Sequence, residues 1–173
     1  DIDRAGDVRI LCNLESNERW ATTLLHELGH GIYDKYHDGA LPFLLRTFAS
    51  YHTTEGVAML MGRLSHNSHF LRDIVQLPAD DLRSLDRPLH KRQREGMVVF
   101  LRFALTMVYF ERSLYENPEQ DLDALWWHLA NRLQGLTRPD GVENAWASKI
   151  HLALVPVYYH NYILGELTAS QLS

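Results

Sequence analysis

The sequence predicts an all-α protein, and two observations favour this fold class. Apolar residues recur at helical spacing between prolines and glycines along most of the chain, and only residues 8–14 (VRILCNL) resemble a short strand. With 173 residues, 46% of them hydrophobic, the chain is long enough to bury one sizeable core. We therefore expect a single helical domain over residues 1–173. Because the chain begins at Asp1 and stops within an amphipathic pattern, we also expect it to be a fragment of a longer protein.

The helices are expected in order from the signals at their ends. Ser16 or Asn17 can cap a first helix, which begins at the acidic Glu18, contains HELGH and ends at HDG, residues 37–39. Prolines, acidic first turns and glycines delimit the later helices in the same way. These are expected from Thr53 or Thr54 to about Leu64, from Pro78 across Asp80 and Asp81, from about Leu89 to Tyr115, from Asn117 and Pro118 to near Gly135, as one helix from the turn at 138–141 to SKIHLALVP (148–156), and after Pro156.

Composition and charge argue against two classes of function. The net charge of -5 and the pI near 6.0 do not suit a nucleic-acid-binding protein, which normally needs a basic face. The longest apolar stretch, residues 97–110, contains Arg102 and is shorter than the ~20 residues that cross a bilayer, so we expect no membrane span. The single cysteine, Cys12, excludes an internal disulfide and a cysteine-based zinc cluster. Histidines and carboxylates are therefore the available metal ligands.

The HELGH sequence is the first candidate metal site. His26 and His30 are four residues apart, so on a helix they share a face and both imidazoles can reach one ion at about 2.0 to 2.1 Å. Glu27 lies between them and can act as general base and general acid in peptide hydrolysis. The alternative is an ordinary amphipathic helix. Gly29 and Gly31 would each cost roughly 1 kcal/mol in a helix, which close packing against a neighbouring helix would explain.

Glu55 is the best candidate for a third ligand. It stands in HTTEGVAML, near the start of an otherwise apolar helix, and should face a packed interior. An unpaired charge is costly there, so a zinc ion would be a natural partner. The alternative is a first-turn glutamate favoured by the helix dipole.

These segments resemble a known group of enzymes. The stretch ERWATTLLHELGHGIYDKYHDGALPFLLR followed by HTTEGVAMLMGRL is similar to the zinc core of helical metallopeptidases. The group includes the angiotensin-converting-enzyme-like peptidyl-dipeptidases and the thimet oligopeptidase and oligoendopeptidase enzymes, which pair HExxH with a glutamate on the next helix. The resemblance implies that His26, His30 and Glu55 bind one Zn²⁺ and that Glu27 activates water. It also implies a multi-helix catalytic core within a larger, cleft-containing helical fold.

A second resemblance lies near the C-terminus. The segment SKIHLALVPVYYHNYILGEL is similar to the part of the converting-enzyme family in which Lys-x-His precedes a pair of tyrosines. By that resemblance His151 and Tyr162 would hydrogen-bond the oxyanion that develops at the scissile carbonyl. Tyr159, with Lys149 as a further candidate, would hold the C-terminal carboxylate of the substrate. Because the spacing is one residue longer than in the family, Tyr158 competes with Tyr159 for this role.

Two positions depart from the family pattern. Met59 stands where the converting enzyme has an aspartate that supports a ligand histidine, so another partner is needed, for which Asp34 is a candidate. Asn161 stands where the animal enzyme has a chloride-binding arginine, which argues against chloride activation.

The sequence thus predicts zinc-dependent hydrolysis of short peptides, by a peptidyl-dipeptidase or an oligopeptidase. The alternative is a catalytically silent zinc-binding helical module or an inactive fragment. Since the resembling families are much longer than this chain, we expect the remainder of the parent chain to complete the cleft.

Overall fold

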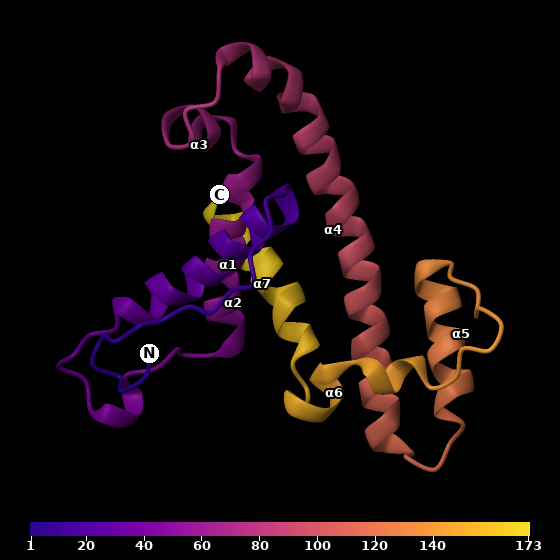
Figure 1. Ribbon diagram of the computed structural model, residues 1–173. Coiled ribbons are helices and arrows are strands. Elements are labelled where there is room, and N and C mark those ends of the chain that lie inside the picture. Colours follow the sequence, from indigo (N-terminus) through magenta and orange to yellow (C-terminus); the bar gives the residue numbers. More distant parts are fainter. The chain divides into compact units, whose positions relative to one another are not determined.

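The computed structural model describes residues 1–173, which form helices and connecting loops without a β-strand (Figure 1). The predicted all-α class is therefore confirmed. Residues 8–14, the one run that resembled a short strand, are irregular, and the Val8 and Ile10 side chains lie against Gly31. The elements are α1 (Glu18–Lys35), η1 (Phe43–Leu45), α2 (Tyr51–Gly62), η2 (Arg63–His66), α3 (Ser68–Asp73), α4 (Ala79–Glu116), α5 (Leu122–Gln134), η3 (Ala145–Ser148), α6 (Ile150–Leu154) and α7 (Tyr159–Leu172).

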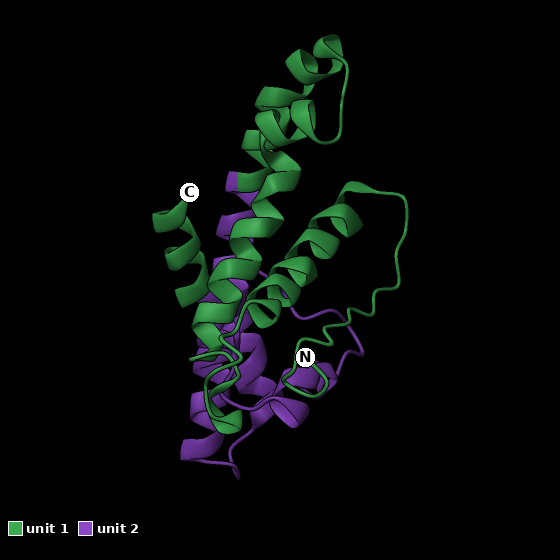
Figure 2. Cartoon of the chain, turned by 90° about the vertical axis from the view of Figure 1, so that its left-hand side faces the viewer, with its two compact units in different colours: residues 1–93, 164–173 green, residues 94–163 purple.

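The chain divides into two compact units (Figure 2). Unit 1 comprises residues 1–93 and 164–173, and unit 2 comprises residues 94–163. One boundary falls inside α4 and the other inside α7. None of the helices combines the length and apolar character that crossing a membrane requires.

Helix α1 begins and ends where its signals predict. The side chain of Asn17 accepts a hydrogen bond from the backbone N–H of Trp20, and Glu18 occupies the first turn, where an acidic group suits the helix dipole. The helix then carries HELGH to Lys35, just before residues 37–39. Its one buried residue is Gly29.

Helix α2 begins slightly earlier than predicted. Ser50, rather than Thr53 or Thr54, is the capping residue, and Thr53 completes a reciprocal capping box by accepting from the backbone N–H of Ser50. The run from Ser50 to Thr54 offers several hydroxyls, and Ser50 and Thr53 have the spacing that satisfies two backbone groups at once. Thr54 is thereby left inside the helix, where it is buried.

Helix α4 unites two predicted elements. The short helix expected from Pro78 and the long one expected from Leu89 are one continuous helix, with Pro88 inside it. The exposed surroundings of Pro88 let water satisfy the carbonyl group that loses its helical partner. The preceding short helix α3, capped by Asn67, was not predicted.

Helix α5 starts later than predicted but ends as expected. The carboxylate of Asp121 caps it by accepting from the backbone N–H of Ala124, whereas the N–H of Asn117 donates to Ser113 at the end of α4. At the other end Gly135 adopts the left-handed conformation, φ 72°, which favours glycine.

The single helix predicted before Pro156 is not formed. The segment instead forms two short elements, η3 and α6, separated by the extended Lys149. Helix α7 then begins at Tyr159, after a sharp turn in which Val157 has a φ of +56°.

The core of unit 2 is aromatic. Met107 and Phe110 of α4 and Trp126 of α5 are buried together, with the Phe110 and Trp126 rings meeting edge to face at 5.3 Å between centroids. Trp126 and its neighbour Trp127 therefore have packing roles. Partly buried side chains around this core include Phe103, Trp146, Leu152 and Tyr159.

Candidate active site

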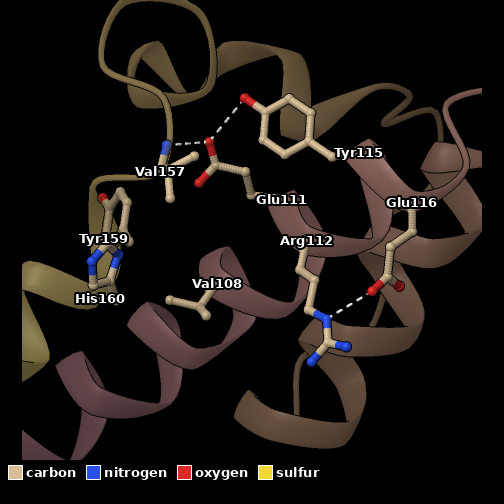
Figure 3. A pocket seen from close by; sticks show the side chains of 8 residues that line it. All are labelled: Val108, Glu111, Arg112, Tyr115, Glu116, Val157, Tyr159 and His160. Carbon is tan, nitrogen blue, oxygen red and sulfur yellow. Dashed lines mark hydrogen bonds and ion pairs between the residues drawn. The ribbon is translucent and has the colours of Figure 1, made fainter.

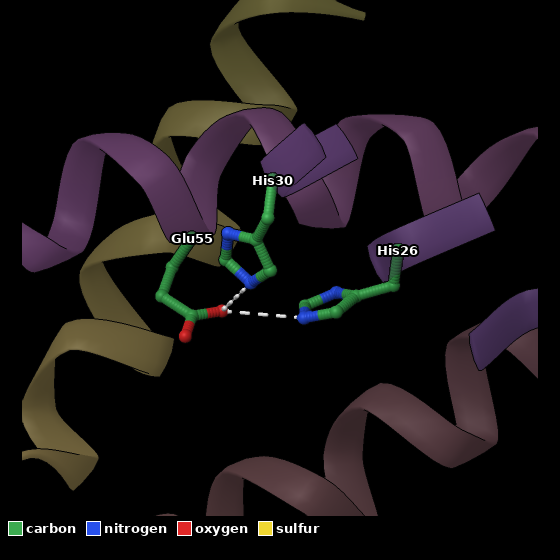
Figure 4. A group of neighbouring side chains, drawn as sticks. All are labelled: His26, His30 and Glu55. Atoms are coloured by element: carbon green, nitrogen blue, oxygen red, sulfur yellow. Dashed lines mark ion pairs between the residues drawn. The ribbon is translucent and has the colours of Figure 1, made fainter. Parts of the chain in front are cut away.

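Three side chains predicted to bind metal converge in unit 1 (Figure 4). His26 and His30 both extend from α1, and Glu55 extends from α2. The Nε2 atoms of His26 and His30 lie 3.5 and 3.8 Å from Oε2 of Glu55. All three residues offer ligand atoms within 4.8 Å of one another.

Glycines allow the helices to approach closely enough for this convergence. A Cβ atom on Gly29 of α1 would lie 2.6 Å from the Cα atom of Ala58 in α2, which is too close for any side chain. A Cβ atom on Gly165 would lie 2.9 Å from the Cβ atom of Glu55 itself. Of the two glycines in HELGHG, Gly29 thus has the predicted role in helix packing. Gly31 instead faces the flexible side chains of residues 8 and 10.

The C-terminal end of α7 is tied to the end of α2 by Arg63. Its Nη2 atom donates to the Glu166 carboxylate at 2.5 Å and to the Ser170 hydroxyl at 2.7 Å. This partly buried ion pair keeps residues 164–173 against α2. In this segment Gly165 lies directly beside Glu55.

Burial keeps the two imidazoles neutral. It lowers the pKa of His26 from 6.5 to about 4, with a smaller contribution from neighbouring His30. It also lowers the pKa of His30, against the opposing effects of Glu27 and Asp34. At pH 7 both rings are therefore uncharged beside Glu55, which is only 2% exposed, and a neutral imidazole can offer a lone pair to a cation.

This donor set fits a metal ion. Ligand atoms at about 2.0 to 2.1 Å from a tetrahedral zinc ion lie about 3.4 Å from one another. The separations of 3.5 and 3.8 Å between the imidazole nitrogens and the Glu55 oxygen are close to that value. Two neutral imidazoles and one carboxylate are also the ligand types that such ions bind. The residues present therefore fit a divalent cation.

The residues predicted to contact the oxyanion lie together in unit 2. The Nε2 atom of His151 and the hydroxyl of Tyr162 are 3.2 Å apart and share a hydrogen bond. The ring centroids of Tyr159 and Tyr158 lie 4.7 and 6.0 Å from that of His151. Burial lowers the pKa of His151, against an opposing effect of Glu111, and raises the pKa of Tyr159.

The predicted carboxylate-binding lysine has an aromatic neighbour. The Nζ atom of Lys149 lies 5.6 Å from the ring centroid of Trp126, within the range of a cation–π interaction. Lys149 stands two residues before His151, where the chain is extended between η3 and α6.

Comparison with known proteins decides the family. A family model described as angiotensin-converting enzyme matches residues 1–163. The chain belongs to the angiotensin-converting enzyme family of peptidases. No curated protein and no solved structure matches the chain significantly. The predicted resemblance to helical metallopeptidases of this type is confirmed, and peptides are the substrates that family membership implies.

In this member of the angiotensin-converting enzyme family, a residue that the sequence did not point out supports a candidate ligand. The Nδ1 atom of His30 lies 2.7 Å from the hydroxyl oxygen of buried Thr54. When Nε2 binds a cation, the proton is on Nδ1 and donates to this oxygen, which fixes both the tautomer and the ring orientation. Asp34, the candidate considered from the sequence, raises the pKa of His30 but is not the group that its Nδ1 atom contacts. The sequence feature that could have pointed to this contact is the position of Thr54 directly before the candidate ligand Glu55.

Replacing Thr54 by valine should weaken metal binding about 10- to 100-fold, because valine keeps the shape of the side chain but cannot accept from Nδ1 of His30. Thr54→Ser should retain most of the affinity. Affinity is measured by competition with a chromophoric chelator. The control is Thr53→Val, since the hydroxyl of Thr53 serves the helix cap. Equal affinities of Thr54→Val and the unmodified protein would contradict the supporting role.

Proposed function

We propose that this peptidase hydrolyses short peptides with one zinc ion held by His26, His30 and Glu55. The strongest support is the approach of two imidazole nitrogens to one oxygen of a buried carboxylate. Catalytic zinc sites use three such protein ligands and leave one position open. Zinc bound there would act as a Lewis acid toward the scissile carbonyl and the attacking water.

The proposed general base is Glu27, which follows His26 on α1. Its carboxylate takes a proton from the attacking water and later donates it to the leaving amine, so that one group serves both steps. Glu27 lies close enough to His30 to raise the pKa of that imidazole, which supports its membership of the same group of side chains. Glu27 lies on the same helix as His26 and His30, and the helical backbone limits the movement of its side chain relative to theirs.

His151 and Tyr162 are the proposed oxyanion donors. Their hydrogen bond of 3.2 Å keeps two polar groups together before substrate arrives. In the reaction both would donate to the tetrahedral oxygen. Donors that are positioned in advance stabilise such a charge by about 3 kcal/mol each.

Lys149 and one tyrosine are proposed to bind the C-terminal carboxylate of the substrate. Both Tyr158 and Tyr159 lie beside His151, so the geometry supports either. A carboxylate-binding pair favours peptidyl-dipeptidase activity, because an oligopeptidase that cuts internally does not require one. We further propose that residues 1–173 act as one catalytic domain and that the remainder of a longer chain supplies the opposite wall of the cleft.

Metal content tests this proposal. The purified, tag-free chain should contain about one zinc ion by mass spectrometry, and Glu55→Ala should lose it, since that change removes one of three ligand atoms that lie within 4.8 Å of one another. Glu15→Ala, which removes an exposed carboxylate, is the control and should retain zinc. Circular dichroism establishes that each variant is folded.

Two outcomes would separate the alternatives. Absence of zinc from the unmodified chain even after zinc is added, or its retention in Glu55→Ala, would refute the assigned ligands. Zinc binding without cleavage of any short peptide would instead support a catalytically silent zinc-binding module.

A further inference from the structure

A buried carboxylate in unit 2 has no part in the function proposed above. Glu111 lies on α4 and is 6% exposed. Its Oε1 atom accepts a hydrogen bond of 2.6 Å from the backbone N–H of Val157 and one of 3.3 Å from the hydroxyl of Tyr115 (Figure 3). Hydrogen bonds that involve a charged acceptor are shorter and stronger than neutral ones, and the bond to Val157 has the short distance of this class.

The backbone that Glu111 binds is in an unfavourable conformation. Val157 has a φ of +56°, in the left-handed region that branched side chains rarely adopt. Such conformations persist only where surrounding contacts hold them, and they are frequent at functional sites. Val157 is therefore a place where the chain needs an external restraint.

Side-chain packing does not provide that restraint. Val157 is 58% exposed, and a cavity of about 370 Å³ lies beside it, bordered by Val108, Glu111 and Tyr159 among others (Figure 3). The neighbouring cation, Arg112, pairs with Glu116 at 2.8 Å. The hydrogen bond from Val157 to Glu111 is thus a direct restraint on the strained residue, beside the hydrogen bond that the buried Asn161 side chain donates to the Tyr158 carbonyl.

The turn links the two proposed oxyanion donors. His151 lies in α6 and Tyr162 in α7, with Val157 near the midpoint of the segment between them. Their contact of 3.2 Å requires the chain to reverse direction in this segment. Glu111 is also close enough to His151 to raise the pKa of its imidazole.

We infer that Glu111 is a positioning residue, whose carboxylate holds the left-handed turn at Val157 and thereby keeps His151 and Tyr162 in contact. The catalytic part of this inference rests on the proposed function. The structural part does not, because the contact between the two side chains can be observed in a chain without activity.

The experiment replaces Glu111 by leucine and by glutamine. Leucine removes the acceptor, whereas the amide oxygen of glutamine can still accept from the N–H of Val157. The first readout is the nuclear Overhauser effect between the rings of His151 and Tyr162. It should fall at least fivefold in Glu111→Leu and stay within about twofold in Glu111→Gln. In any active form of the protein, kcat should fall about tenfold in Glu111→Leu, with KM little changed, and should be largely kept in Glu111→Gln.

Two further variants make the test specific. Glu116→Leu removes an exposed carboxylate from the same helix and should leave both readouts unchanged. Val157→Gly permits a positive φ without strain, so adding it to Glu111→Leu should recover at least half of the lost Overhauser effect.

The outcomes decide the inference in either direction. An unchanged ring contact in Glu111→Leu, an equal loss in Glu116→Leu, or no recovery in the double variant would overturn it. If Glu111→Leu does not fold, the double variant with Val157→Gly supplies the comparison. Loss of the ring contact in a chain that cleaves no peptide would support the positioning role while counting against the proposed reaction.

Discussion

Glu27→Gln should lower the rate of peptide hydrolysis about 10²- to 10⁴-fold and leave the metal content unchanged. That range is the usual contribution of a positioned general acid and base. Glutamine has the same size as glutamate but cannot take a proton from water at neutral pH. The three candidate metal ligands are separate residues, so their arrangement should not change. The measurement is kcat/KM on a short peptide, with zinc determined in the same preparation.

The control for this substitution is Glu15→Gln, which neutralises an exposed carboxylate in the same unit. It should retain full activity. The fall in Glu27→Gln should appear in kcat rather than in KM, since the lost interaction belongs to the transition state. A variant that keeps more than a tenth of the activity would show that Glu27 is not the base.

Gly29→Ala should destabilise the protein by about 1 to 3 kcal/mol and weaken metal binding. The added methyl group would lie 2.6 Å from the Cα atom of Ala58, and backbone atoms cannot move aside as a side chain can. Helices α1 and α2 must therefore separate. Because these helices carry the two histidines and Glu55, the ligand atoms should separate with them. Urea unfolding and chelator competition measure the two effects.

Gly31→Ala is the matched control, because it introduces the same methyl group two residues further along α1. Its nearest neighbour would be the end of the Ile10 side chain at 3.2 Å, which can rotate away. Alanine also favours helix over glycine by about 1 kcal/mol, so this variant should be as stable as the original or more so. Equal destabilisation by the two substitutions would contradict the close helix contact at Gly29.

Local signals in the sequence predicted much of the fold. Asn17, Glu18 and Gly135 have the roles expected of a cap, a first turn and a helix end. The errors arose where several residues offered the same signal, as with the hydroxyls before α2, or where a proline lay in an exposed part of a long helix. Neighbours and solvent decide such cases, and they are not visible in a short stretch of sequence.

The candidate site, like the fold, could be predicted from the sequence only where the signal is local. The spacing of His26 and His30 and the apolar surroundings of Glu55 predicted a shared site because these properties are local. Thr54 could not be assigned to His30 in advance, since their contact depends on how α1 and α2 pack. The role of Glu111 depends on a turn at Val157 that no sequence pattern indicates, because valine rarely adopts a positive φ.

The neutral hydroxyl of Thr54 also affects the net charge around a bound cation. A carboxylate in its place would add a second negative charge to that of Glu55, whereas threonine and the buried Met59 add none. A dication held by His26, His30 and Glu55 would therefore take one negative charge from its ligands, and the further carboxylates near His30 are those of Glu27 and Asp34. Because the Thr54 hydroxyl is neutral, it would raise the basicity of the His30 ring less than a carboxylate would, so the cation would be retained less tightly.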